Sequence, residues 1–556
     1  MKKPVLLGVA VALTFLVAGA LAWWLMAVSA PGPRVARVLS AKDSMGFLGF
    51  EGLDGVVRRV DTLTASLPAE LRAPLPAFLD PTKRKDVIGF DPSTAAGWQG
   101  IGIDPEAGVA IAADDRLIDG RKKPNFVGLV RITDRERLSS WLTARLGHKP
   151  PAAWFESGVH PIELPGSQLL AGERQGWTFL SPLTSATDAA KNGENLKKLL
   201  TDDGPTLDRD ASFRVAFDHV PTGWRGLAYL HADGLLAAAK AMELPETTLQ
   251  IAAYEAHLFR SFGLYTGDST GARLSASTDG VDALRKLLLP VSKAPDFTKW
   301  MPRSGWLMLQ LSVNLKDAFD GVTALIPSQM TEARGAVAAG RMFMPLALGF
   351  GWDDLVQAFS GHLLVAVQVD AKGSVATTPA WRVALAVQDP KAADALVEKL
   401  KGLAVKRGAT VTATPIGSMQ GFTLSIKGIQ AVGVRQGDLL WLASDAQVLI
   451  AGQNLSSSES LTGTEVASAL EPETVFALIS GALAAPQSPA AGAALTVRLD
   501  AHGLLAQTHG NPGQWQALAA LIGQSFLRLQ RAALAPSAAQ AALPAPATAP
   551  EAPAGE

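Results

Sequence analysis

The sequence predicts an α+β protein: two tandem duplicated modules of antiparallel sheet with helices packed on one face, after an N-terminal transmembrane helix. Three observations predict this class. The pattern of residues 97–192 returns at 351–454, short alternating apolar runs are interleaved with amphipathic stretches, and an uncharged apolar run occupies residues 4–29. With 556 residues the chain also exceeds a single hydrophobic core.

The uncharged run at 4–29 follows two lysines and has two tryptophans near its outer end. It is long enough to span about 30 Å of hydrocarbon, and indole rings favour the membrane interface. A cleaved signal peptide is the alternative, because Ala20-Leu21-Ala22 offers a small-residue site. Since the apolar run continues beyond that site, we expect an uncleaved signal anchor. A short N-terminus before a long globular part predicts an inner-membrane protein with its bulk in the periplasm.

The internal repeat keeps the same order of elements in both copies. The later copy contains GW (351–352), LLVAVQV (363–369), WRVALAVQD (381–389), a helical stretch (389–402) and QGDLLWLASDAQVLIAGQN (436–454), and the earlier copy contains GW (97–98), GVAIA (108–112), NFVGLVRITD (125–134), a helical stretch (134–147) and QGWTFLSPLTSATDAAKN (175–192). We expect each apolar run to be a strand and each helical stretch to pack on the sheet.

Each module contains a helix whose limits the sequence predicts. Asp389 is placed to accept hydrogen bonds from first-turn amides, and Pro390 occupies the first helical position. Leu396, with Val397 and Leu400, makes an apolar stripe, and we expect Gly402 to end the helix in the left-handed conformation. The residues 255 positions earlier than Asp389, Leu396, Val397 and Gly402 are Asp134, Trp141, Leu142 and Gly147.

Strand-then-helix patterns open both halves and recur inside them. They are residues 45–63, 224–242, 304–322 and, more weakly, 475–483, and strands followed by a closing helix are expected at 271–291 and 493–523. These matches divide the chain into a signal anchor (1–30), a first repeat half (31–292), a second repeat half (293–531) and an Ala/Pro-rich tail (532–556). We expect a disordered tail, with a semi-rigid spacer as the alternative.

The composition excludes several functional classes. The chain has no cysteine, which excludes disulfides, thiolate nucleophiles, cysteine-ligated metals and lipoprotein attachment. Its 50 basic and 51 acidic residues leave a net charge of −1, so no overall field attracts nucleic acid. We expect no nucleic-acid partner.

No motif predicts catalysis. The chain lacks the phosphate-loop, zinc-helix and nucleophile-elbow patterns, and no two of its eight histidines lie four residues apart. Even His362, which opens an expected central strand, has an apolar counterpart in the other copy. The GxG within residues 97–104 is interpreted as a strand-entry turn. We therefore predict no catalytic, cofactor-binding or metal-ligating residues, and no cofactor.

Two groups of residues carry alternative interpretations. The acidic pairs Asp114-Asp115, Asp202-Asp203 and Asp353-Asp354 are candidates for general acid–base chemistry, but each adjoins turn residues and is interpreted as a helix cap or solvated loop. Trp98 and Trp352 match across the copies and are expected to be core anchors under the sheet. For the other tryptophans, core packing competes with lining an apolar groove or facing the membrane: Trp154, Trp224, Trp300, Trp306 and Trp441.

The segments VALAVQDPKAADALVEKLKG (383–402) and LLWLASDAQVLIAG (439–452) resemble modules of an uncharacterised domain-of-unknown-function family. Its members are membrane-anchored bacterial envelope proteins with duplicated α+β modules. The first copy departs from that pattern, with Asp134-Arg135 in place of Asp389-Pro390. The resemblance implies location and fold, and implies no activity.

Three functions follow as hypotheses. The first is a non-catalytic, membrane-anchored periplasmic scaffold, an accessory component of an envelope complex with a protein partner. The second is a lipid or lipoprotein carrier with an apolar cavity between sheet and helices. The third is an unrecognised envelope hydrolase, which needs a cleft with clustered acids or a histidine of shifted pKa.

Overall fold

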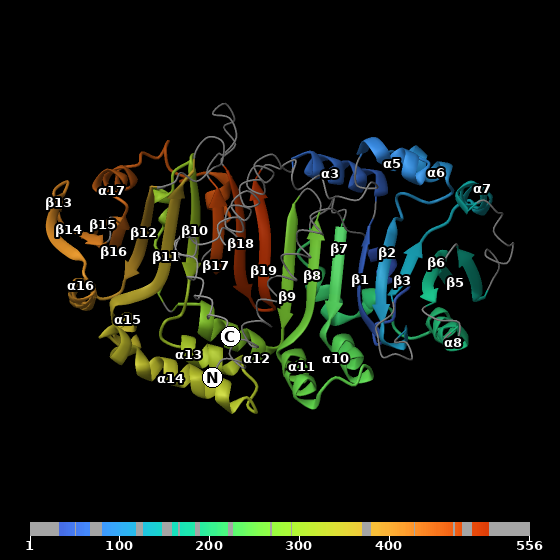
Figure 1. Cartoon of the computed structure of the whole chain (residues 1–556), viewed down its shortest axis with the longest axis horizontal. Coiled ribbons are helices and arrows are strands. Elements are labelled where there is room, and N and C mark those ends of the chain that lie inside the picture. The colour runs from blue at the N-terminus through green and yellow to red at the C-terminus, as the bar shows by residue number, and fades with distance from the viewer. Residues whose placement is uncertain are drawn as a thin grey trace, which may run out of the picture.

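The computed structural model describes the central part of the chain and leaves gaps. The described residues are 33–50, 52–66, 81–117, 126–146, 158–164, 167–183, 189–220, 226–266, 269–290, 292–369, 380–426, 429–470, 473–480 and 492–510. Their strands form one antiparallel sheet of 19 strands, and helices line its upper and lower edges, where the strands end (Figure 1). The predicted anchor and tail lie outside these ranges.

The strands and helices of the described part are as follows. The strands are β1 (Ser44–Phe50), β2 (Val109–Asp114), β3 (Phe126–Val130), β4 (His160–Leu164), β5 (Ser167–Arg174), β6 (Trp177–Leu183), β7 (Gly226–His231), β8 (Phe259–Thr266), β9 (Thr270–Ala276), β10 (Trp306–Ser312), β11 (Phe359–Gln368), β12 (Trp381–Val387), β13 (Thr410–Ile416), β14 (Met419–Ile426), β15 (Ile429–Gln436), β16 (Leu439–Ala443), β17 (Thr474–Ser480), β18 (Ala493–Asp500) and β19 (Gly503–Gly510). The α-helices are α2 (Pro33–Ala36), α3 (Leu53–Ser66), α5 (Pro81–Ile88), α6 (Ala95–Gly100), α7 (Arg135–Leu146), α8 (Ala189–Leu200), α9 (Ala211–Phe217), α10 (Ala232–Ala241), α11 (Glu246–Leu258), α12 (Thr278–Leu288), α13 (Ala318–Ala324), α14 (Thr331–Leu348), α15 (Trp352–Ala358), α16 (Pro390–Lys406), α17 (Ala446–Gln453) and α18 (Glu465–Ser468), with 3-10 turns η2 (Asp115–Leu117), η5 (Leu207–Arg209) and η6 (Phe297–Trp300).

The strand order is the same on both sides of a central β9–β19 pair. Outward from that pair it runs β9-β8-β7-β1-β2-β3-β6-β5-β4 on one side and β19-β18-β17-β10-β11-β12-β16-β15-β14-β13 on the other. The strands predicted at the four strand-then-helix openings are confirmed as β1, β7, β10 and β17, which occupy matching places in this order. The two halves therefore share one continuous sheet.

One side of the sheet, here called the outer face, carries the main hydrophobic core. In the first half, Phe47, Phe179 and Tyr229 pack beneath α2, α8 and α9. In the second half, Leu364 and Trp441 pack with residues of η6, α17 and α18. Side chains at every second strand position point to this face, which is the period expected of a sheet with a buried side.

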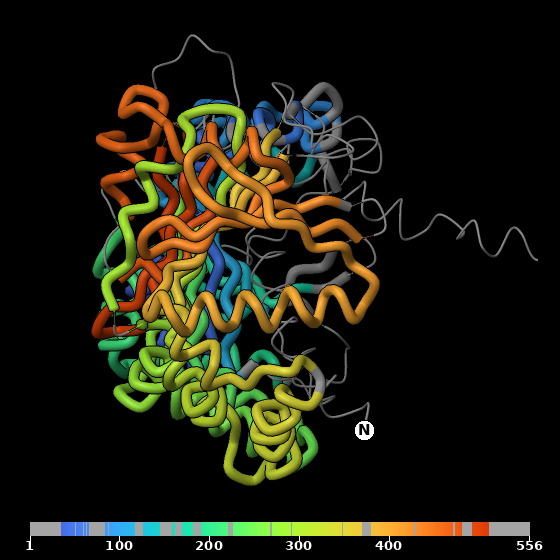
Figure 2. Tube along the Cα trace, turned by 90° about the vertical axis from the view of Figure 1, so that its left-hand side faces the viewer, coloured from blue at the N-terminus to red at the C-terminus, as the bar shows by residue number. Residues whose placement is uncertain are grey.

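Helices lie on both sides of the sheet, which corrects the prediction that they pack on one face. On the side opposite the outer face, Leu396 of α16 packs with Leu440, and Leu284 of α12 packs near Val497. We call this side the inner face. Figure 2 shows the β13–β15 end of the sheet bending toward it, with α16 beneath. The bend lets this end of the long sheet bury apolar surface against α16.

Helix α16 begins as predicted but ends later. Asp389 accepts hydrogen bonds from the Lys391 and Ala392 amides at 2.8 and 3.2 Å. The helix continues through Gly402 to Lys406, and Gly408 instead adopts a left-handed φ of 87°. A glycine inside a helix costs only about 1 kcal/mol, so Gly402 does not end this one. The predicted helix at 134–147 is confirmed as α7 (Arg135–Leu146).

A buried ion pair joins the halves beside the β9–β19 pair. Arg273 of β9, 3% exposed in its side chain, contacts Asp500 of β18 at 2.8 Å and Asp218 at 3.3 Å. Its Nε also donates to Nδ1 of His219 at 3.3 Å. Burial and the neighbouring guanidinium lower the pKa of His219, so this histidine is neutral and accepts from Arg273.

Candidate ligand-binding face

The inner face of the sheet is apolar from one half to the other. Each residue of one row is paired with the next across neighbouring strands, so these side chains share a face. From β3 to β16 the row is Gly128, Ile111, Leu48, Ala228, Leu264, Ala272, Ala506, Val497, Phe476, Leu311, Leu363, Leu385 and Leu440. No member of the row is polar or charged.

Much of this row is partly open rather than sealed in a core. Ile111 is 49% exposed, and two side chains in the next positions on the same face, Phe126 and Leu230, are 53% and 44% exposed. The half-buried members of the row are Gly128, Leu48, Ala272, Ala506, Val497, Phe476, Leu311, Leu363 and Leu385. The remaining members, Ala228, Leu264 and Leu440, are buried. Exposed apolar side chains that gather on one face, as Ile111, Phe126 and Leu230 do, mark interaction sites.

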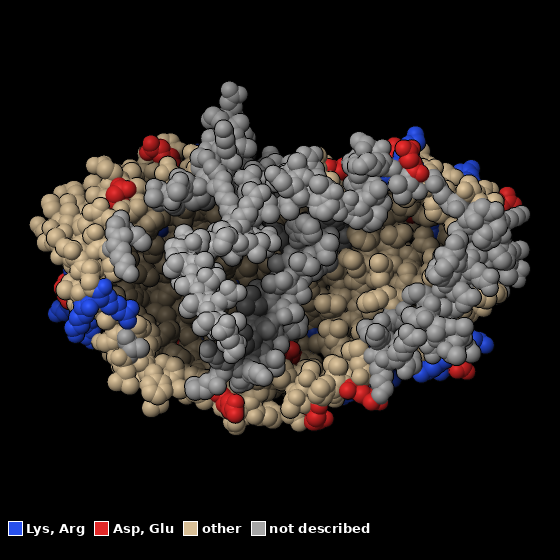
Figure 3. All heavy atoms as spheres, in the orientation of Figure 1, with Lys and Arg blue, Asp and Glu red and all other residues tan. Residues whose placement is uncertain are grey.

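The inner face is also hollowed. Figure 3, which views the molecule from this side, shows uncharged surface in the hollow and most of the charged side chains along its rim. An uncharged concave surface with a polar rim favours apolar ligands, because burying apolar area is favourable while burying unpaired charge is costly. We therefore take the inner face as the candidate site.

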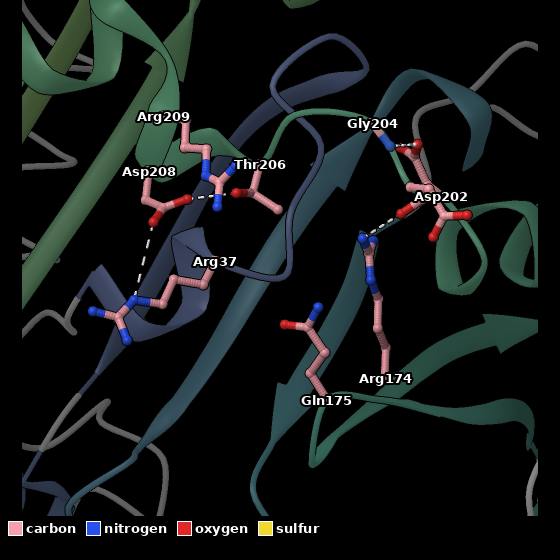
Figure 4. A pocket seen from close by; sticks show the side chains of 9 residues that line it. Arg37, Arg174, Gln175, Asp202, Gly204, Thr206, Asp208 and Arg209 are labelled. Atoms are coloured by element: carbon pink, nitrogen blue, oxygen red, sulfur yellow. Dashed lines mark hydrogen bonds and ion pairs between the residues drawn. The ribbon is translucent and has the colours of Figure 1, made fainter.

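A second, polar pocket of about 540 Å³ lies near the end of α8 (Figure 4). Two of its arginines have partners within the fold: Arg37 lies 4.0 Å from Asp208, and Arg174 donates to the carbonyl oxygens of Val38, Leu199 and Asp202. The lining residues are Arg37, Arg174, Gln175, Asp202, Asp203, Gly204, Thr206, Asp208 and Arg209. This lining contains no histidine, and its one hydroxyl, that of Thr206, donates to Asp208 Oδ1 at 2.6 Å.

Two of the acidic pairs meet at one arginine. Arg116 binds Asp114 with two hydrogen bonds of 2.7 Å and Asp202 with one of 3.0 Å, and Asp43 lies 3.3 Å away. Asp114 also accepts from the Arg116 amide at 3.1 Å at the start of η2, so its interpretation as a cap is borne out, whereas its 1% exposure contradicts a solvated loop. No sequence pattern predicts the contact with Asp202, because Arg116 and Asp202 are 86 residues apart.

The third acidic pair behaves as predicted. The Gly351 amide donates to Asp354 Oδ2 at 2.6 Å, which caps helix α15, and Lys399 contacts the other carboxylate oxygen at 2.9 Å. The hydrogen bond from Lys399 is the main reason why the pKa of Asp354 is lowered. Asp353 pairs with Arg341 at 2.8 Å. Both carboxylates lie in the first turn of α15, where the helix dipole favours acidic side chains.

Asp115 gives a pH-dependent prediction. Burial, together with the Asp114 and Asp43 carboxylates, raises its pKa from 3.8 to about 6. An acid with a higher pKa in the folded state destabilises the fold progressively as pH rises from about 4 to about 6. We expect Asp115→Asn to raise Tm above about pH 6 and to leave it unchanged below about pH 4. Thermal melts across this range, with the exposed Asp203→Asn as control, test this; an equal gain at both ends of the range contradicts it.

His362, which opens the predicted central strand, makes structural contacts within the fold. His362 on β11 is 4% exposed, its Nδ1 lies 2.9 Å from Ser312 Oγ, and its Nε2 donates to the Ser292 carbonyl oxygen at 2.9 Å. Burial lowers its pKa. This serine–histidine pair faces the closed outer side, where no substrate reaches it. In the described ranges no three His, Asp or Glu side chains are arranged to hold a metal ion.

The matched tryptophans lie on short helices rather than under the sheet. Trp98 of α6 donates to the Pro92 carbonyl oxygen at 2.8 Å, and Trp352 of α15 donates to that of Leu315 at 2.7 Å. Both are half-buried. Helix α6 ends at Gly100, the first glycine of the GxG, and Ile101 and Gly102 form a turn that leads to the bridge between Ile103 and Ile132, as predicted for this glycine pair. Trp441 is the core anchor, 1% exposed on β16.

Comparisons with protein-family models, curated proteins and solved structures found no match for this chain. The family resemblance seen in the sequence stays a prediction. Among the helices in the described ranges, none combines the length and hydropathy needed to cross a bilayer. The predicted anchor at 4–29 lies outside those ranges.

Proposed function

We propose that this protein is a membrane-anchored carrier of the bacterial envelope, which holds the acyl chains of a lipid or lipoprotein on its inner face. The observation that carries the proposal is the uncharged row from Gly128 to Leu440, with partly exposed side chains at Ile111, Phe126 and Leu230. This is the second of the three functions expected from the sequence, and it involves no catalysis.

The energetics of the row favour an acyl chain over a polar ligand. Each methylene that leaves water contributes about 0.8 kcal/mol. A polar ligand in the same place loses its hydrogen bonds to water, at a cost of roughly 1–3 kcal/mol for each unpaired group. The row of apolar side chains has no polar member to offset that cost. It therefore selects ligands by shape and apolarity.

Membrane attachment and duplication are parts of the same proposal. The uncharged run at 4–29 supports an uncleaved anchor with the bulk of the chain in the periplasm. The matching strand order on the two sides of the β9–β19 pair, and the 255-residue offset between Asp134 and Asp389, support two modules derived from one. Joining two such modules edge to edge doubles the length of the apolar row.

The experiment compares lipid retention by variants of the full chain. We expect wild-type protein released from detergent to carry lipid in native mass spectrometry. We expect the Ile111→Glu/Leu230→Glu variant to have lost it, because two carboxylates then lie on the inner face. Both positions are more than 40% exposed, so the changes spare the core. All variants keep the predicted anchor, so a difference between them reports on the inner face.

The control is Val405→Glu, which places a carboxylate on a 54% exposed apolar position of α16 outside the row. It is expected to retain lipid like the wild type. Equal lipid on all three proteins would mean that the inner face does not hold it. A wild-type protein without lipid would contradict the carrier proposal and favour the scaffold hypothesis. Crosslinking in the envelope would then identify the protein partner.

A further inference from the structure

Helix α14 presents three large apolar side chains to solvent. Met342 is 75% exposed, Phe343 is 61% exposed and Leu346 is 82% exposed. Their spacing places them on one side of the helix, and Ala338 and Gly335 lie on the same side one and two turns earlier. Because exposed hydrophobic residues normally occur singly, this cluster indicates a surface that contacts something else.

The opposite side of α14 already holds the helix on the fold. Met344 and Leu348 pack against the cluster that contains Phe350, and Arg341 pairs with Asp353 of α15. The helix is thus apolar on both sides, and only one side is covered. Apolarity all round is typical of a helix that is buried in protein or in a membrane.

The edge of the sheet that carries α14 is also the edge at which β1, the first strand, begins. Figure 1 shows α10 to α14 along the lower edge. Strand β1 starts there, since the Ser44 carbonyl oxygen lies against Gly234 of α10, only 2.6 Å from where a Cβ would be. Residues 30–32 are all that separate the predicted anchor from Pro33, and three residues span at most about 11 Å. A bilayer that holds the anchor is therefore close to the start of the fold.

We propose that α14 lies in the interface of that bilayer, with Met342, Phe343 and Leu346 among the upper acyl chains. This inference rests on the anchor in the proposed function. Interfacial helices bury their apolar side by about 5–10 Å, which matches a patch of single side chains. A second copy of the chain fits less well: three side chains offer at most about 500 Å², below the roughly 800 Å² per partner of a stable protein interface.

This placement connects the membrane to the candidate site. With α14 in the interface, the lower edge of the sheet lies against the lipid surface, and the apolar inner face rises from that edge. A lipid that leaves the bilayer then meets apolar side chains at once. The acyl chains then spend less time in water. Contact of apolar chains with water is the main free-energy cost of moving a lipid out of a bilayer.

The absence of cysteine makes a direct test simple. The full chain with Leu346→Cys is labelled with an environment-sensitive fluorophore, and Gln447→Cys, an exposed site on α17 at the upper edge, is the matched control. Both proteins are reconstituted into phospholipid vesicles, and flotation confirms attachment. Nitroxide-bearing lipids are then added to the mixture as quenchers. We expect a blue shift and loss of most of the emission at position 346, with neither change at 447.

The outcomes separate this proposal from the proposed function. An unshifted, unquenched label at 346 on protein that floats with the vesicles overturns the placement of α14 while leaving the anchor intact. A blue-shifted label that lipid nitroxides do not quench also overturns it, because protein then covers α14. Chains that do not float at all refute the anchor itself, and with it both proposals.

Discussion

Replacing Arg116 with methionine is expected to lower the free energy of unfolding by about 3–5 kcal/mol. The substitution leaves the Asp114 carboxylate, 1% exposed, without its two hydrogen bonds of 2.7 Å. Burial already raises the pKa of Asp114 despite this partner, so the ionised form depends on Arg116. Without it, the fold must either bury an unpaired charge or take up a proton.

Urea unfolding of the full chain in detergent measures this effect. The double variant Asp114→Asn/Arg116→Met is expected to recover much of the loss, because the buried charge is then gone as well. Arg58→Met is the matched control, since Arg58 is 59% exposed and pairs with Asp54; such surface pairs contribute about 0–1 kcal/mol. A loss at Arg116 no larger than at Arg58 would show that the cluster does not stabilise the fold.

Replacing Arg273 with methionine is expected to cost about 2 kcal/mol and to weaken the coupling between the halves. Arg273 is 3% exposed and links Asp500 with Asp218 across the central strands. The expected loss is smaller than at Arg116, because Asp500 and Asp218 are 29% and 43% exposed and regain water when the arginine is removed.

Calorimetry and limited proteolysis test whether Arg273→Met weakens the coupling between the halves. If the halves unfold together in the wild type, Arg273→Met should lower Tm and broaden or split the transition, with cleavage appearing between the halves. Arg285→Met serves as control, since its pair with Asp282 is exposed on both sides. An unchanged transition in the Arg273 variant would mean that the other contacts between the halves, among them the β9–β19 pairing and the packing of Leu284 against Leu499, couple them without Arg273.

Local signals in the sequence predicted elements well and their ends less well. The start of α16 followed from Asp389 and Pro390, since capping depends on neighbouring backbone groups alone. Its end did not follow from Gly402, because an internal glycine costs only about 1 kcal/mol and the helix continues to Lys406. In the same way, strand positions followed from alternation, whereas the short helices around Trp98 and Trp352 were not predicted.

The candidate site was not predictable from motifs, because it is made by pairing rather than by spacing. Ile111 and Leu48 are ordinary residues of apolar strands in the sequence, and only the register of β1 with β2 makes them neighbours. The acidic cluster is similar: Asp202 reaches Arg116 across 86 residues. Contacts between residues so far apart in the sequence depend on the topology of the whole fold, so no local sequence pattern predicts them.

By itself the sequence determined the alternation of the strands, the start of helix α16 and the repeated order of elements, since each depends on residues that are near neighbours in the chain.

The tertiary structure alone decided which side of a strand is covered by other segments. On β12, alternation suggests that Arg382 faces water and that Val383 and Leu385 face the core. Instead, Arg382 is 1% exposed and lies beneath η6, where its guanidinium stacks 4.9 Å from the centre of the Trp306 ring and donates to the Trp300 carbonyl oxygen. Val383 and Leu385 are half-buried and lie on the inner face. Burial raises the cost of that charge and lowers the pKa of Arg382 to about 10. Both sides of this sheet are apolar, so the covering segments, and not the alternation, determine which one is left to bind a ligand.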